Sequence, residues 1–242
     1  MPIVGDGIEA DTGTWKFSGK TVDAFDNHVS KSVPLYHEGH NLITDVSDYF
    51  VRDNSLIYEL GCSTGSLTIN LAKHNQKKSE VRHIGIDIEK DMITKAKEKQ
   101  SLLSKSLGKT IHFEDKNIID LNFEKSDLII CYYTLQFTSP SVRQIIVDKI
   151  YESLNWGGAF LFFEKVRGAD ARFQDILTGL YTDFKLRNDY TPDDIIAKTR
   201  SLKGVMEPFS TQGNLDLMSR AGFVDVNTVL KYTCFEGWLA IK

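Results

Sequence analysis

The feature that most constrains the fold is a series of short apolar segments separated by helical patterns. Strands that are largely apolar are typical of a parallel sheet buried on both faces, with helices as crossovers. Two further strands near the C-terminus follow each other too closely for a helix and must pair antiparallel. We therefore predict an α/β, doubly wound, seven-stranded Rossmann-like sheet whose last strand is antiparallel, with strands at 55–60, 82–87, 109–114, 127–131, 159–164, 223–230 and 233–241.

The segments around these strands predict one domain, 1–242, with added helices. Residues 1–14 have no periodicity and are expected to form a loose tail. N-terminal helices are expected within 15–54, with an amphipathic helix over 35–51, and further helices over 89–105 and 140–154. Residues 169–220 are helical and polar, and they interrupt the strand–helix alternation. We expect them to form a cap inserted before strand six, over the sheet edge where ligands bind.

Charge and cysteine content exclude several classes of protein. The net charge of −4 is spread over mixed-sign segments, so it gives no strong signal for a nucleic-acid partner. The three cysteines show no paired spacing, which favours a reducing, cytoplasmic location. The acidic N-terminus does not resemble a signal peptide, and no apolar run approaches the roughly 20 residues that cross a bilayer. We expect neither a membrane partner nor a metal site, since His37 and His40 lack a third ligand.

The loop from Glu59 to Gly65, Glu-Leu-Gly-Cys-Ser-Thr-Gly, joins the first strand to a helix. Glycines at such a bend let backbone N–H groups approach a ligand. A dinucleotide fingerprint is disfavoured because Ser63 replaces its second glycine and the third is missing. The loop also matches the nucleophile elbow GxSxG. That hydrolase fold needs a late histidine, and no histidine follows His112.

The remaining interpretation is a loop that binds S-adenosylmethionine. Asp87 ends the second strand, 22 residues after Gly65, where a carboxylate can accept both ribose hydroxyls. The carboxylate of Glu59 attracts the positively charged ammonium and sulfonium of this ligand, whereas it would repel a pyrophosphate. The alternative is an ordinary βα turn beside a surface aspartate.

From Trp15 to Lys242 the sequence resembles the carboxy-S-adenosylmethionine synthase family. The matching stretches are SVPLY at 32–36, ELGCSTG at 59–65, GID at 85–87, TLQF at 134–137, DKIYESLNWGGA at 148–159, EK at 164–165 and DFKLRNDY at 183–190. The resemblance implies a class I methyltransferase fold, an S-adenosyl-L-methionine cofactor or its carboxylated derivative, and a homodimer. In tRNA modification the family supplies the modified cofactor for a wobble uridine.

The resemblance also implies a set of ligand contacts. Together with Glu59 and Gly65 from the loop argument, the cofactor-binding residues are expected to be Tyr36, Gly61, Cys62, Ser63, Asp87, Ile88, Asn117, Ile118 and Tyr132. Two positions depart from the family, which has aspartate in place of Asn117 and asparagine in place of Tyr132. Asn117 can still pair with an adenine amino group through its side-chain oxygen.

A third departure concerns an arginine that, in the family, reaches in from the neighbouring subunit and binds the extra carboxylate of the product. Without gaps this arginine aligns with Thr199, which Lys198 and Arg200 flank. A buried carboxylate without a cation costs several kcal/mol. Arg200 can replace the arginine only if the helix is re-registered, because one residue turns a helix by about 100°.

Three functions follow from these observations. The first is transfer of a methyl group from S-adenosylmethionine to an unidentified acceptor, which Thr199 and Tyr132 favour. The second is the family reaction, carboxylation of the cofactor with prephenate-derived carbon dioxide, which the full-length resemblance and Arg200 favour. The third is non-catalytic cofactor binding. We expect a small-molecule substrate contacted at Thr199 and Arg200, with Tyr132, Tyr133 and Arg200 as candidate catalytic residues.

Overall fold

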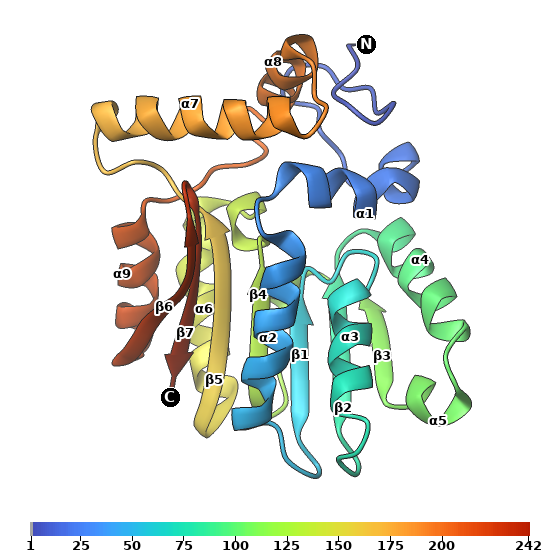
Figure 1. The fold of residues 1–242 in the computed structure, drawn as a ribbon. Helices are drawn as coiled ribbons and strands as arrows, with labels where there is room; N and C mark the ends of the chain where they lie inside the picture. Colours follow the sequence, from blue (N-terminus) through green and yellow to red (C-terminus); the bar gives the residue numbers. More distant parts are fainter. Residues whose placement is uncertain (1) are drawn as a thin grey trace.

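The computed structural model describes residues 2–242 and consists of one mixed sheet between two layers of helices (Figure 1). The seven strands lie in the order β3-β2-β1-β4-β5-β7-β6. Strands β1 to β5 are parallel, and β7 is antiparallel to both β5 and β6. This confirms the predicted fold. The strands are β1 Leu56–Leu60, β2 Arg82–Asp87, β3 Ile111–Asp115, β4 Ser126–Tyr132, β5 Leu154–Lys165, β6 Asp225–Tyr232 and β7 Phe235–Ile241.

The helices divide between the two faces of the sheet and its carboxyl edge. Helices α2 and α3 pack together on one face, next to α4, while α6 and α9 pack together on the other (Figure 1). The helices are α1 Lys20–Ser32, α2 Tyr36–Phe50, α3 Ser66–His74, α4 Lys90–Ser101, α5 Lys105–Gly108, α6 Pro140–Ser153, α7 Ala171–Arg187, α8 Pro192–Ser201 and α9 Thr211–Ala221, with short 3-10 turns η1 Ile118–Asp120 and η2 Leu135–Phe137. Parallel strands buried on both faces explain the apolar runs, since every residue of β1 is buried.

The cap is smaller than the predicted span 169–220. Helices α7 and α8 lie across the carboxyl edge of the sheet, together with α1 and the N-terminal segment (Figure 1). Helix α9 instead packs against α6 on the sheet face. Its apolar residues Leu217 and Met218 are fully buried there, so α9 contributes to the core rather than to the cap.

The prediction of a loose tail over 1–14 is wrong for the described part of that segment; Met1 lies outside the described residues. Val4, Ile8 and Ala10 are buried with Trp15 and with Ala197 of α8. A turn closed by the Val4 N–H, which donates to the Ile8 carbonyl over 2.8 Å, supports this contact. Burial of these apolar side chains stabilises the segment against the rest of the domain. Its irregular sequence has no periodic pattern from which this packing could be predicted.

Two element boundaries also differ. The single helix predicted over 89–105 is divided into α4 and α5, because the chain turns at Leu102 and Ser104 caps α5. Strand β5 begins at Leu154 rather than Ala159, and it contains Gly157 and Gly158.

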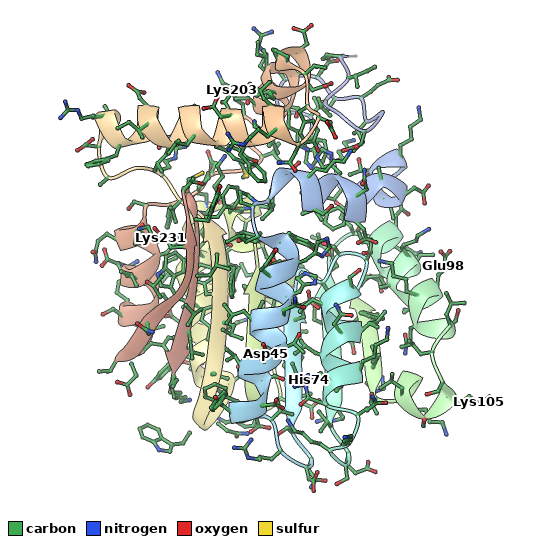
Figure 2. All side chains as sticks on the ribbon, in the orientation of Figure 1. Asp45, His74, Glu98, Lys105, Lys203 and Lys231 are labelled. Atoms are coloured by element: carbon green, nitrogen blue, oxygen red, sulfur yellow. The ribbon has the colours of Figure 1, made fainter. Side chains whose placement is uncertain are left out.

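Charged side chains such as Asp45 and Glu98 lie on the outer faces of the helices (Figure 2). In residues 2–242 no helix is both long and apolar enough to cross a membrane.

Candidate active site

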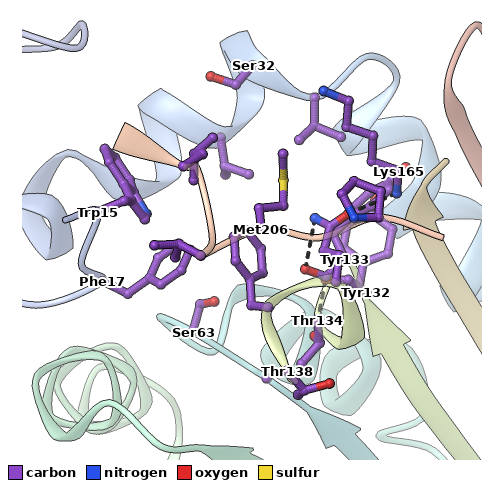
Figure 3. A pocket seen from close by; sticks show the side chains of 18 of the residues that line it. Trp15, Phe17, Ser32, Ser63, Tyr132, Tyr133, Thr134, Thr138, Lys165 and Met206 are labelled. Carbon is purple, nitrogen blue, oxygen red and sulfur yellow. Dashed lines mark hydrogen bonds between the residues drawn. The ribbon is translucent and has the colours of Figure 1, made fainter. Parts of the chain in front are cut away.

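A cavity of about 970 Å³ lies between the carboxyl edge of the sheet and the cap. Its lining comes from the glycine loop, the ends of β2, β4 and β5, and helices α1, α7 and α8. Figure 3 shows Ser63 and Thr138 on one side of it and Trp15 and Phe17 on another, with Met206 reaching into the middle. Single-ligand pockets usually range from about 300 to 1,000 Å³, so this cavity lies at the upper end of that range.

The glycine loop takes its shape from backbone contacts with β2. The N–H groups of Gly61 and Cys62 both donate to the Ile86 carbonyl, over 2.7 and 2.9 Å. Gly61 has φ of +77°, and a Cβ there would collide with the Thr134 side chain. Ser63 also has a positive φ, 49°. A non-glycine residue in this region costs on the order of 1–3 kcal/mol, and such strain gathers at ligand sites.

Asp87 holds the loop and faces the same cavity. Its Oδ2 accepts the Ser63 N–H over 2.8 Å, and its Oδ1 accepts the Glu89 N–H over 2.9 Å. Each carboxylate oxygen has a second lone pair, which remains for a ligand hydroxyl. Burial raises the pKa of Asp87, because the charged form loses hydration. The carboxylate is therefore fixed and desolvated, as a ribose acceptor needs to be.

Glu59 is a second acid beside the loop, at the end of β1. It is buried at 5% exposure and accepts a hydrogen bond from the Thr68 hydroxyl. Burial raises the pKa of Glu59 to about 8, and the neighbouring Asp87 adds to the rise. A cation bound beside Glu59 would favour its ionised form. The floor of the cavity thus suits a positively charged ligand.

Three tyrosines form an aromatic wall near this floor. The ring centroid of Tyr132 lies 5.3 Å from that of Tyr36 and 4.6 Å from that of Tyr133. The Tyr132 hydroxyl donates to the Tyr36 carbonyl over 2.7 Å, so it holds the wall together. Tyr133 has a positive φ of 61°, and its buried hydroxyl has no partner among residues 2–242. Aromatic faces attract a sulfonium by about 0.5–2 kcal/mol.

His40 is buried against this wall. Its ring centroid lies 4.5 Å from that of Tyr36 and 5.0 Å from that of Tyr132. Burial lowers the pKa of His40 to about 4, so the ring is neutral. Among residues 2–242 no cluster of His, Cys, Asp and Glu could hold a metal ion.

The structure brings most of the expected site residues together. The cavity is lined by Tyr36, Glu59, Gly61, Cys62, Ser63, Asp87, Ile88, Asn117, Ile118, Tyr132, Tyr133 and Thr199. Exposed Ile88 offers an apolar surface, while the Asn117 oxygen accepts the Ile119 N–H over 3.1 Å. Gly65 and Arg200 do not line the cavity. Gly65 instead allows close packing on Phe113 and Ala96.

Sequence reasoning missed several cationic residues that line the cavity, among them Lys165, Lys185 and Lys198. Lys165 ends β5, and a charged residue at the carboxyl end of a parallel strand is a signal that could have identified it. Lys185 and Lys198 lie on α7 and α8, where lysines usually form solvated faces. Only the packing of the cap reveals their position.

The sheet order, the glycine bend and the paired acids define a class I S-adenosylmethionine-dependent enzyme of the methyltransferase superfamily. A family model described as "Methyltransferase domain" matches residues 58–160. Among solved structures, magnesium protoporphyrin IX methyltransferase from Synechocystis, with bound SAH, is 16% identical with a TM-score of 0.62, covering 93% of this chain and 96% of that one. Human N-acetylserotonin methyltransferase in complex with SAM has a TM-score of 0.59 at 20% identity, covering 91% of this chain and 54% of that one.

Full-length relatives identify the family more closely. A carboxy-S-adenosyl-L-methionine synthase from Staphylococcus epidermidis is 33% identical over 94% of this chain and 97% of its own length. The protein of the same name from Campylobacter lari is 32% identical over 94% of each chain. The chain belongs to the carboxy-S-adenosyl-L-methionine synthase family, and it is an S-adenosylmethionine-dependent transferase.

Proposed function

We propose that this enzyme transfers the methyl group of S-adenosylmethionine to a small acceptor bound under the cap. S-adenosylmethionine supplies an electrophilic methyl group with its own leaving group, so the protein mainly has to position the two reactants. In this proposal Asp87 accepts the ribose hydroxyls, Ile88 and Ile118 flank the adenine, and Glu59 faces the positively charged end. All four residues line the cavity, which supports these assignments.

The observation that carries methyl transfer is the environment of Thr199. It stands where the family has a carboxylate-binding arginine, and its hydroxyl donates to the Ile195 carbonyl of its own helix over 2.8 Å. Arg200 is exposed and does not line the cavity of its own chain. Thr199 carries no charge, so an extra carboxylate on the cofactor would lack the family's cation at this position.

The test is the mass of the S-adenosyl compound that co-purifies with the full chain. Methyl transfer predicts unmodified S-adenosylmethionine or its demethylated product, with no species about 44 Da heavier. A heavier, carboxylated compound as the main ligand would contradict the proposal. Incubation with labelled S-adenosylmethionine and candidate acceptors then identifies the methylated product.

The second candidate is synthesis of carboxy-S-adenosylmethionine from prephenate, which would serve tRNA wobble-uridine modification. The names of the relatives favour it, as do Lys165, Lys185 and Lys198 in the cavity lining. The two candidates differ in one step, since only the second adds a carboxylate to the cofactor. The mass measurement therefore separates them.

We also infer that the enzyme is a cytoplasmic homodimer. Phe173, Ile176 and Leu180 lie on one face of α7 and are 55%, 51% and 47% exposed. An apolar helix face of this kind suits a second copy of the chain. The cysteines, all buried free thiols, suit a reducing compartment. Ile176→Lys should convert a dimer seen by analytical ultracentrifugation to a monomer; a wild-type monomer would refute the dimer.

A further inference from the structure

Two buried charged groups bind the turn that follows β4, one through its N–H groups and the other through its carbonyls. We call residues 133–138, which contain η2, the β4 turn. Glu164 lies near the end of β5 and Arg143 lies in α6, and each is 2% exposed. Within residues 2–242 neither side chain forms an ion pair. Both charges are thus kept in the core without a direct contact to an opposite charge.

The Glu164 carboxyl binds the N–H side of the turn. The Leu135 N–H donates to its Oε1 over 2.9 Å. The backbone N–H groups of Gln136 and Thr134 also stabilise its charged form. Burial raises the pKa of Glu164 to about 8, although the positive charge of Arg143 acts against this rise. The carboxyl therefore faces the N–H groups of three successive residues.

The Arg143 guanidinium binds the carbonyl side of the same turn. Its Nε and Nη2 donate to the Thr138 carbonyl over 3.2 and 2.8 Å, and Nη2 also donates to the Gln136 carbonyl over 3.4 Å. The guanidinium carbon lies 4.4 Å from the centroid of the Phe209 ring. The carbonyl oxygens and the ring replace part of the hydration that the buried cation loses. Two charged groups from different elements thus fix the conformation of the β4 turn.

The β4 turn in turn supports the glycine loop. The Thr134 hydroxyl donates to the Leu60 carbonyl over 2.8 Å. The Thr134 side chain also occupies the space that a Cβ at Gly61 would need. Thr134 and Thr138 both line the cavity, and they lie below Tyr132 in Figure 3. A shift of the β4 turn would therefore remove a support of the loop on which we place the cofactor.

The turn also holds a strained residue of the aromatic wall. Tyr133, its first residue, has φ of +61°. Such a backbone conformation costs on the order of 1–3 kcal/mol for a residue other than glycine and persists only where the surroundings fix it. Buried charges often give way to apolar residues of similar volume without loss of stability. Stability alone thus does not explain Glu164 and Arg143, whereas fixing the turn does.

We propose that Glu164 and Arg143 are positioning residues that hold the β4 turn against the glycine loop and thereby set the affinity for the adenosyl cofactor. Neither residue touches the cofactor in this proposal; both act through Thr134. The inference rests on the proposed function in one respect, the place of the cofactor at the glycine loop.

The experiment measures the Kd of S-adenosylhomocysteine by calorimetry on the full chain, with circular dichroism to show that each variant is folded. Glu164→Leu removes the acceptor of the Leu135 N–H and should raise the Kd about tenfold. Glu164→Gln keeps a carbonyl oxygen at that place, so its Kd should stay within about threefold of the wild type. Arg143→Met should raise the Kd about fivefold, because the turn carbonyls lose their donor.

The matched control is Glu236→Leu. Glu236 is 1% exposed and lies opposite Glu164 in the β5–β7 ladder. Its carboxylate binds Thr211 and Lys231, neither of which lines the cavity. Both leucine variants remove a buried carboxylate and its contacts, so both should have a lower Tm. Only Glu164→Leu should change the Kd, and Glu236→Leu should stay within about twofold.

A double-mutant cycle tests whether Glu164 acts through Thr134. Thr134→Val loses only the hydroxyl that binds the Leu60 carbonyl, and it should raise the Kd about fivefold by itself. Glu164→Leu combined with Thr134→Val should bind within about twofold of Glu164→Leu alone, because the same support is lost once. Additive effects would overturn the route through Thr134. If Glu164→Leu does not fold, an unchanged Kd in Thr134→Val overturns the proposal by itself.

Asp87→Ala separates this inference from the proposed function. Weaker binding in Asp87→Ala with an unchanged Kd in folded Glu164→Leu, or an equal loss in Glu236→Leu, would overturn the positioning role and leave the proposed function standing. Unchanged binding in Asp87→Ala with weaker binding in Glu164→Leu would overturn the place of the cofactor in the proposed function. Unchanged binding in all variants would overturn both.

Discussion

The buried carboxyl of Glu59 predicts a pH dependence of cofactor binding. Burial beside Asp87 raises the pKa of Glu59 to about 8 in the ligand-free enzyme. A bound sulfonium and ammonium favour the ionised form, so S-adenosylmethionine binding should expel the proton. Below pH 8 the free energy needed to remove this proton from Glu59 weakens S-adenosylmethionine binding. The Kd should therefore fall about tenfold per pH unit between pH 6 and 8, which is about 1.4 kcal/mol per unit.

The assay is calorimetric titration with S-adenosylmethionine from pH 6.0 to 8.5, comparing the wild type with Glu59→Gln. Glutamine keeps the size of the side chain and its bond with Thr68 but does not titrate. The wild-type dependence should level off near pH 8, while the variant should be nearly flat. A wild-type Kd that is independent of pH, or a variant with the same slope, would refute the assignment of Glu59 to the cationic end.

The same group predicts a pH dependence of stability. Because the folded pKa of Glu59 lies above its unfolded value, the folded state binds more protons between about pH 4.5 and 8. The contribution of Glu59 is thus fully present at low pH and is lost as the pH rises through 8. Without ligand, the Tm of Glu59→Gln should fall less than that of the wild type between pH 6 and 8.5.

Four further substitutions test individual contacts. Asp87→Ala should weaken S-adenosylhomocysteine binding by about 1–3 kcal/mol in calorimetry, through lost charged hydrogen bonds. Tyr132→Phe removes the bond to the Tyr36 carbonyl and should lower the free energy of unfolding by about 1 kcal/mol in urea. Phe162→Ala, in the fully buried core, should cost about 3–5 kcal/mol in the same assay. Thr199→Arg should raise affinity for the carboxylated cofactor more than tenfold and leave that for S-adenosylmethionine unchanged.

The strands and the glycine loop could be predicted from the sequence because their signals are local. Gly61 and Gly65 both have positive φ, which few other residues tolerate, and Asp87 ends a strand that is buried from His83 onward. The parallel order of the central strands follows from the helices between them. These features require no knowledge of distant contacts.

The cap could not be predicted to the same extent, since its structure depends on contacts between distant segments. Val4 and Ile8 are buried in a cluster with Trp15 and with Ala197 of α8, and irregular spacing gives no sign of this. Helix α9 has the same polar composition as the cap but lies on α6. Lys185 and Lys198 resemble solvated surface lysines until α7 and α8 turn them into the cavity.

The most direct test of the central claim is a crystal structure of the full chain with S-adenosylhomocysteine. We predict that the ribose hydroxyls lie within hydrogen-bonding distance of the Asp87 carboxylate, with the adenine between Ile88 and Ile118. The sulfur should face the tyrosine wall beside Tyr132. A ligand bound elsewhere, with the bend from Gly61 to Gly65 unoccupied, would contradict the account.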